Sequence, residues 1–228
     1  MLEQTRRRIP LWVKIAYTLF VAVLVPKYWI DYGPTNFLYF CDVALLLTVV
    51  CVWRESALLA SVSAVGILLP QALWQVDFIG SLFGMPVTGM TAYMFDEALP
   101  LFTRFLSFFH FWLPLFLLWL LSRLGYDRRA FPAWTAMAVV LLIVCYFVSP
   151  PPPPPPDRPG LPVNINYVYG LGDAEAQTWM DPDLYFIGLL VLQPIVIFWP
   201  THWLLKRVFP AAKLGDQPQR SNGQYGIR

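Results

Sequence analysis

Long apolar stretches dominate this sequence, and they constrain the fold more than any other feature. Six of them have about 20 residues, the length that an α-helix needs to cross the hydrocarbon core of a bilayer. They are residues 10–29, 35–53, 56–78, 100–121, 132–148 and 184–205. Only a helix or a closed barrel satisfies its own backbone hydrogen bonds in lipid. The sequence therefore predicts an all-α fold, a polytopic membrane helical bundle of about six transmembrane helices.

The composition agrees with a lipid environment. Of the 228 residues, 57% are hydrophobic and 13% are charged, whereas about 25% of the residues in an average soluble domain are charged. A soluble domain of this length cannot hide so much apolar surface. The formal net charge is only +2, and no basic stripe is interleaved with aromatic residues, which argues against nucleic acid as a partner.

The positive charges predict how the bundle is oriented, because lysine and arginine accumulate in cytoplasmic loops. An N-terminus in the cytoplasm places most of them on that side: Arg6, Arg7, Arg8, Arg54, Arg123, Arg128, Arg129, Lys206, Arg207, Lys213, Arg220 and Arg228. Lys27, Arg104 and Arg158 then lie toward the outside. The sequence thus predicts a multi-pass protein of the cell membrane with both termini in the cytoplasm.

The segments outside the apolar stretches differ in character. Residues 1–9 have the basic start of a secretory signal, but no clear cleavage site follows, so we expect a retained first span. Residues 79–99 are rich in glycine and predict a re-entrant or interfacial segment. Pro150–Pro156 lies in the predicted outer loop 149–183 and predicts a stiff, extended spacer. Residues 1–210 are expected to form one membrane domain, and residues 211–228 a disordered cytoplasmic tail.

Polar side chains inside the predicted spans are candidate functional groups, because an ionisable group costs a few kcal/mol in hydrocarbon. Three predicted spans place such groups in their outer halves: Asp42, Gln71, Gln75, Asp77, Arg104 and His110. We expect them to converge on an outward-facing polar pocket, to which we also assign Asn166 of the outer loop. A structural alternative is an ion pair between Arg104 and either Asp42 or Asp77 that holds the helices together.

Cys41 and His110 form the pair that could carry covalent chemistry. A thiolate attacks an acyl carbonyl, and a neighbouring imidazole can accept the thiol proton and return it to a leaving group. The simpler interpretation of Cys41, as of Cys51 and Cys145, is a small buried hydrophobic residue. The sequence contains no P-loop, no H-E-x-x-H, no G-x-S-x-G and no Cys/His metal pattern. We therefore expect neither a cofactor nor a metal.

Three short motifs resemble a known family. They are the stretch 36–46 (NFLYFCDVALL), the pattern His110-x-x-x-Pro114 and Asn164-Ile165-Asn166-Tyr167. These motifs look like those of the YwaF-like bacterial membrane proteins, which are distantly similar to the androgen-induced lipid hydrolases and to a related ether-phospholipid acyltransferase. The resemblance covers roughly residues 34–110 and the outer loop.

This resemblance implies Cys41 as a nucleophile and His110 as its base, acting on a membrane lipid. The hydrolase branch looks as if it carries threonine at the nucleophile position, so Cys41 fits the acyltransferase branch better. Tyr39 is a departure, because the bacterial pattern usually has a histidine there.

Three functions remain open from the sequence. The first is a lipid acyl hydrolase or acyltransferase that uses Cys41 and His110, with membrane lipid as the partner. The second is a non-enzymatic binding or assembly protein of the membrane, and the third is a small-solute transporter. No duplication between the two halves is visible, which counts against the common transporter folds. The sequence indicates neither a particular substrate nor a protein partner.

Overall fold

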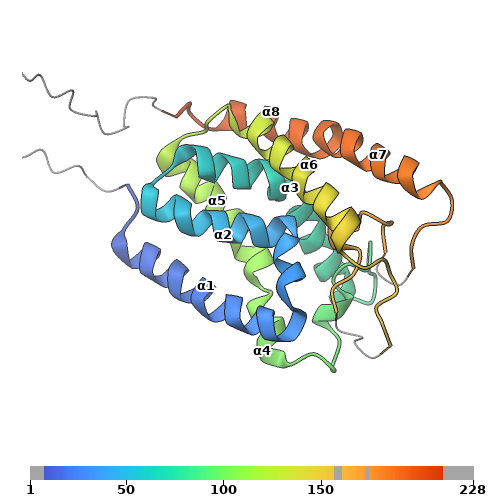
Figure 1. Cartoon of the computed structure of the whole chain (residues 1–228). Coiled ribbons are helices and arrows are strands. Elements are labelled where there is room, and N and C mark those ends of the chain that lie inside the picture. Colours follow the sequence, from blue (N-terminus) through green and yellow to red (C-terminus); the bar gives the residue numbers. More distant parts are fainter. Residues whose placement is uncertain (1–7, 157–160, 173–174, 213–228) are drawn as a thin grey trace, which may run out of the picture.

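The computed structural model describes residues 8–156, 161–172 and 175–212, and these residues form a helical bundle without a β-strand (Figure 1). This confirms the predicted all-α fold. The helices are α1 Leu11–Tyr32, α2 Phe40–Arg54, α3 Ala57–Leu82, α4 Leu101–Leu106, α5 Phe109–Leu124, α6 Ala130–Val148, α7 Pro182–Gln193 and α8 Trp199–Val208. Short turns of 3₁₀-helix occur at η1 Pro34–Leu38, η2 Ala92–Met94 and η3 Ile165–Tyr167. A π-helical turn, η4 Pro194–Phe198, joins α7 to α8.

The helices make six passes between the two ends of the bundle, namely α1, α2, α3, α4 with α5, α6, and α7 with α8, and Figure 1 shows how they run. At one end, which we call the terminal end, the start of α1 meets the α2–α3 turn. There the backbone N–H groups of Arg8 and Ile9 donate to the Glu55 carboxylate. The backbone of Tyr126, between α5 and α6, pairs at the same end with the residues that follow α8. The opposite end, which we call the loop end, carries the segments 83–100, 149–156, 161–172 and 175–181.

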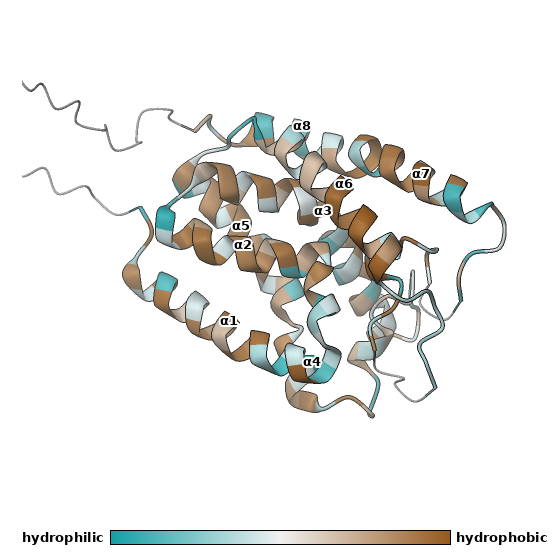
Figure 2. Ribbon diagram, in the orientation of Figure 1, coloured by the Kyte–Doolittle hydropathy of each residue, from teal (hydrophilic) through white to brown (hydrophobic). Residues whose placement is uncertain are grey.

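Five of the six passes are helical segments long and apolar enough to cross a membrane: Leu11–Tyr32, Ala57–Leu82, Leu101–Leu124, Ala130–Val148 and Pro182–Val208. Hydrophobic residues cover most of the length of these helices, and hydrophilic ones gather near their ends and in the loops (Figure 2). Several of the predicted boundaries lie within a few residues of these helices. The structure therefore supports a multi-pass membrane protein.

The second pass differs from the predicted span 35–53. Gly33 has a φ of 80° and Pro34 begins η1, so the chain turns before α2 starts at Phe40. The helix α2 has 15 residues and therefore measures about 22 Å along its axis. This is less than the roughly 30 Å of a hydrocarbon core. The six-span topology remains a prediction, in which α2 alone does not span the full thickness.

The helix α3 is the centre of the bundle, in contact with α2, α5, α6 and α8. Small residues let its neighbours approach closely, and Gly66 is the tightest point. A Cβ atom at Gly66 would overlap the indole ring of Trp134 on α6. In the most apolar stretch of α3, 56% is buried inside the bundle, whereas in that of the segment from α7 to α8 only 17% is buried. The first is a core helix, and the second lies at the periphery.

The polyproline run is described from Pro150 to Pro156 and contains neither helix nor strand, as expected. Most of the predicted cytoplasmic tail lies outside the described residues.

Candidate functional site

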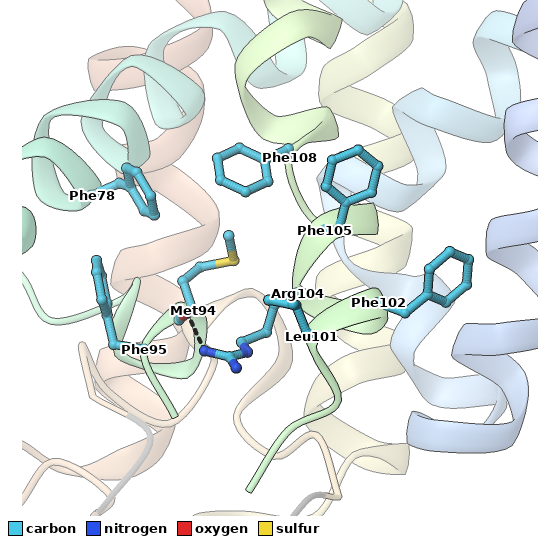
Figure 3. Close-up of a pocket in the computed structure, with 8 residues that line it drawn as sticks. All are labelled: Phe78, Met94, Phe95, Leu101, Phe102, Arg104, Phe105 and Phe108. Carbon is cyan, nitrogen blue, oxygen red and sulfur yellow. Dashed lines mark hydrogen bonds between the residues drawn. The ribbon is translucent and has the colours of Figure 1, made fainter. Parts of the chain in front are cut away.

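A cavity of about 540 Å³ opens near the loop end, between the last turns of α3, the turn η2 and α4 (Figure 3). Its lining is Phe78, Met94, Phe95, Leu101, Phe102, Arg104, Phe105 and Phe108. The α4 segment contributes positions spaced three and four apart, because one face of a short helix borders the cavity. Arg104 is the only charged residue of the lining. The cavity is thus an apolar site with a single cation.

The rim of the cavity lies on the surface of the bundle. Leu101, Phe102 and Phe105 border the cavity and are exposed to 74%, 51% and 65%. The cavity is therefore accessible from outside the bundle.

Arg104 makes a long hydrogen bond and not the ion pair that was the structural alternative. Its Nη1 donates to the carbonyl oxygen of Met94 over 3.3 Å, and its Nε is buried without a hydrogen-bond partner (Figure 3). Among the described residues neither Asp42 nor Asp77 forms an ion pair with it. The ion-pair alternative was wrong: Asp77 is bonded to the segment 83–91, and the Asp42 carboxyl has only the thiol of Cys41 beside it.

Five rings form a stack that begins at this cavity: Phe95, Phe78, Trp74, His110 and Phe109. Successive ring centroids are 5.3, 5.4, 4.8 and 4.1 Å apart, and the planes are inclined by 8° to 29°. Offset stacking of this kind stabilises aromatic pairs beyond their buried area. The stack connects the cavity wall to the core, where Phe109 is almost fully buried.

Two glutamines of α3 bond to His110, one to its imidazole and the other to its backbone carbonyl. Its Nδ1 lies 2.9 Å from Oε1 of Gln71, and Nε2 of Gln75 donates to the His110 carbonyl oxygen over 3.2 Å. Since Oε1 accepts the bond, Nδ1 carries the proton in this arrangement. The structure thus brings together three of the residues that the sequence assigned to one pocket.

The thiol of Cys41 has a different partner from the imidazole. Its Sγ lies 3.7 Å from Oδ2 of Asp42, the next residue along α2, and it makes no hydrogen bond to His110. The structure therefore contains no thiol–imidazole pair poised for proton transfer.

Asp77 accepts hydrogen bonds from the loop that follows α3. Its Oδ1 accepts hydrogen bonds from the backbone N–H groups of Val87, Thr88 and Gly89, and its Oδ2 accepts from the N–H and the hydroxyl of Thr91. This carboxylate is fully buried, but all its contacts are favourable to a negative charge. The segment 83–91 consequently folds back on α3.

Asn166 lies far from α2 in the sequence but caps the start of this helix. Its Oδ1 accepts from the N–H of Phe40 at 3.0 Å, and its Nδ2 donates to the Leu38 carbonyl at 2.9 Å and toward Cys145 Sγ at 3.4 Å. A left-handed φ of 58° directs it inward. Asn164 closes the same loop through bonds to Tyr169 and Gly170. In the structure, both asparagines of the Asn-x-Asn motif make bonds that hold the loop in place.

Asp42 differs from these residues because it lacks a strong partner. Its side chain is 3% exposed, and Oδ1 has no hydrogen bond. The Asp42 carboxyl lies within electrostatic range of the hydroxyl groups of Tyr28 and Tyr32. The expectation that Asp42 faces the interior agrees with this burial.

Sequence reasoning missed the hydroxyl groups near Asp42. Tyr28 lies 2.6 Å from Ser107, whose hydroxyl donates to the Thr103 carbonyl, and Thr103 in turn donates to Asp31 at 2.6 Å. Serine and threonine are common in membrane helices, so only their spacing of four residues on α4 signals a shared face.

Glu55 at the terminal end is an acidic residue outside the spans with three hydrogen-bond donors. Burial raises the pKa of its carboxyl, but hydrogen bonds from Lys14 Nζ at 2.7 Å and from the N–H groups of Arg8 and Ile9 lower it more. The pKa of Glu55 therefore lies below its ordinary value. Glu55 ties the start of α1 to the α2–α3 turn.

No protein-family model matches this sequence, and neither a curated protein nor a solved structure matches it. The resemblance of the three short motifs therefore stays a prediction. Any function proposed for this chain rests on the geometry of its own residues.

Proposed function

We propose that this membrane protein binds an anionic lipid, with its apolar chain in the cavity beside α4 and its anionic group on Arg104. The observation that supports this most is the composition of the cavity wall, seven apolar residues and one arginine. Apolar pockets with one or two placed polar groups are typical of ligand sites. The function is binding; chemistry on the ligand is a separate question.

The hydrogen bonding of Arg104 favours an anionic ligand. A guanidinium group has five donors and matches phosphate or carboxylate oxygens in a bidentate manner. Arg104 uses Nη1 in a long bond to a neutral carbonyl, while its buried Nε has no acceptor. A buried donor without an acceptor is unfavourable by about 1–3 kcal/mol. An anionic group at this place would satisfy it.

The size and position of the cavity favour a membrane ligand over a soluble one. The volume of about 540 Å³ lies in the usual range of ligand pockets, about 300–1,000 Å³, and holds part of a lipid rather than all of it. The exposed rim residues Leu101 and Phe105 would contact the remaining chain. Under the predicted orientation, the ligand comes from the outer leaflet.

Acyl chemistry by Cys41 and His110 stays a prediction that no contact in the structure favours. The thiol faces Asp42, and the imidazole is bonded to Gln71 within the ring stack. Phe78 and Trp74 stand in that stack between the cavity-lining Phe95 and His110. A lipid seated in the cavity would therefore meet aromatic rings before it met the imidazole.

Photo-crosslinking tests the proposal. The full chain is reconstituted in phosphatidylcholine nanodiscs with a trace of diazirine-labelled phosphatidylglycerol, and crosslinked peptides are mapped by mass spectrometry. We expect crosslinks on α4 and η2. Arg104→Gln should lower them about tenfold, because a charge-assisted hydrogen bond contributes about 1.5–3 kcal/mol.

The matched control is Arg123→Gln, which removes an arginine of α5 that stacks on Trp119 at the terminal end. This change should leave the crosslinks on α4 unaltered. An uncharged diazirine diacylglycerol that labels α4 as strongly as the anionic probe would refute the role of Arg104. Labelling spread evenly over all outward-facing helices would refute the site.

A further inference from the structure

The carboxyl group of Asp42 lies in the first turn of α2, deep inside the bundle. It is 3% exposed, and one of its oxygens has no hydrogen-bond partner at all. The other oxygen has only the thiol of Cys41 at 3.7 Å. No lysine, arginine or histidine pairs with it among the described residues. A carboxylate in such a place would be an uncompensated buried charge.

The titratable groups that interact with Asp42 among the described residues are neutral. They are Tyr28 and Tyr32 on α1 and Cys41 on α2. Tyr28 is engaged with Ser107, whose own proton goes to the Thr103 carbonyl, so the Tyr28 hydroxyl donates to Ser107. It is therefore not a donor to Asp42. The surroundings stabilise a neutral carboxyl rather than a carboxylate.

A metal cation is a poor occupant of this place. Hard cations take six or more oxygen ligands, and Asp42 offers two. The described residues contain no group of three His, Cys, Asp or Glu side chains arranged around a metal position. A proton needs only one oxygen, and it removes the charge.

A row of polar side chains leads from this region to the loop end. It runs from Tyr28 to Ser107, on to Thr103 one turn earlier in the chain, and then to Asp31. Asp31 is half-buried and paired with Lys27 at 2.7 Å. The row marks a polar route in an otherwise apolar bundle.

We propose that Asp42 is a proton-binding site within the membrane domain, occupied at neutral pH and in exchange with the loop end of the bundle. Binding adds one proton to a carboxylate oxygen and changes the charge of the site from −1 to 0; release returns the proton to water at the loop end. This site is separate from the lipid cavity, and the proposal does not rest on lipid binding.

Asp77 provides a matched control in the same helical bundle. Both carboxyls are buried, but Asp77 accepts five hydrogen bonds and has no reason to hold a proton. The apolar reagent N,N′-dicyclohexylcarbodiimide reacts with protonated carboxyls: the carboxyl O–H adds across a C=N bond, and the adduct rearranges to a stable N-acylurea. No further reactant is needed, and the wild-type chain can be used in micelles.

We expect the reagent to modify Asp42 in preference to Asp77, and the modification to decline as the pH rises. Modification of Asp77 to the same extent or more would overturn the proposal. If the reagent reaches neither residue, the infrared spectrum decides. The wild-type protein should then show the carbonyl stretch of a protonated carboxyl, and Asp42→Asn should lack it, while Asp77→Asn should retain it.

An infrared spectrum of the wild type without that band at neutral pH would overturn the proposal, and so would a band unaffected by Asp42→Asn. If Asp42→Asn does not fold, Asp42→Glu keeps a carboxyl and should shift the band. A band that does not move in this variant belongs to another group and counts against Asp42.

Discussion

Two buried aspartates, Asp77 and Asp42, lie in different environments within one bundle. Asp77 ends a long helix where the chain returns on itself, and four backbone N–H groups and one hydroxyl converge on its carboxylate. Asp42 begins a short helix whose N–H at Phe40 is already capped by Asn166. Burial alone therefore does not define a functional carboxyl. The hydrogen-bond donors around a buried carboxyl distinguish a structural carboxylate such as Asp77 from a carboxyl without donors such as Asp42.

Replacement of Asp77 by alanine should give the largest effect on stability. It would leave five donors without an acceptor beside the segment 83–91, and unpaired buried donors are each unfavourable by about 1–3 kcal/mol. We expect a loss of about 3–5 kcal/mol, since some donors will be hydrated. Unfolding in detergent measured by circular dichroism would show it. A loss below about 1 kcal/mol would mean that the loop does not depend on Asp77.

Asn166→Ala should be the next in size. It removes the acceptor for the Phe40 N–H and the donor to Leu38, an N-cap-like arrangement that contributes about 1–2 kcal/mol. The same unfolding assay measures it, with Gln177→Ala as a control, because Gln177 bonds only within the loop end, to Met180 and Tyr169. Equal losses in both variants would contradict a specific role at α2.

Asp42→Asn should have almost no effect on stability, in contrast to the Asp77 variant. A neutral carboxamide of the same shape replaces a neutral acid, and the Cys41 thiol still finds a carbonyl oxygen. We expect a change within about 0.5 kcal/mol, as for substitutions that break no partner. A loss of several kcal/mol, on the scale of a broken buried ion pair, would show that Asp42 is a charged group with a partner.

Glu55 supplies a third carboxyl, whose effect on stability depends on pH. Its pKa in the folded protein lies below the unfolded value, so its stabilisation is present above the unfolded pKa and is lost as the pH falls through the folded pKa. Thermal melting between neutral and acidic pH should therefore show a smaller decline for Glu55→Gln than for the wild type. Parallel declines would contradict the bonds to Lys14 and the first residues of α1.

The thiol of Cys41 should show no dependence on His110. Because the imidazole is bonded to Gln71 rather than to the thiol, labelling of Cys41 by an acyl-mimicking thiol reagent should be unchanged in His110→Ala. Cys51 and Cys145 serve as internal references. A marked loss of Cys41 labelling in that variant would instead favour the acyl-transfer prediction from the sequence.

Much of the fold was accessible from hydropathy, because the spacing of apolar runs is dictated by bilayer thickness. The short α2 was not, since Thr35–Leu38 is apolar enough to continue a helix and only the geometry at Gly33 and Pro34 shows that it turns first. The grouping of Gln71, Gln75 and His110 followed from their depth in the spans. The bonding partners of these side chains could not be derived, because hydropathy does not reveal which way a helix faces. Arg104 and Asp77 lie at similar depth, but each bonds to the segment 83–100 and not to the other.

The aromatic cavity was missed for a related reason. Phenylalanines in a membrane sequence look like lipid-facing residues, and five of the eight lining residues are phenylalanines. Only the arrangement of η2 against α4 turns them into a wall around Arg104. The sequence signal was limited to one arginine within an apolar stretch.

Native mass spectrometry of the full chain, released from mixed phosphatidylcholine and phosphatidylglycerol nanodiscs, tests the central claim most directly. Wild-type protein should retain phosphatidylglycerol in preference to phosphatidylcholine, and Arg104→Gln should lose that preference while Arg123→Gln keeps it. Retention of the two lipids in the proportion of the nanodisc, by wild type and Arg104→Gln alike, would contradict an anionic-lipid site at Arg104.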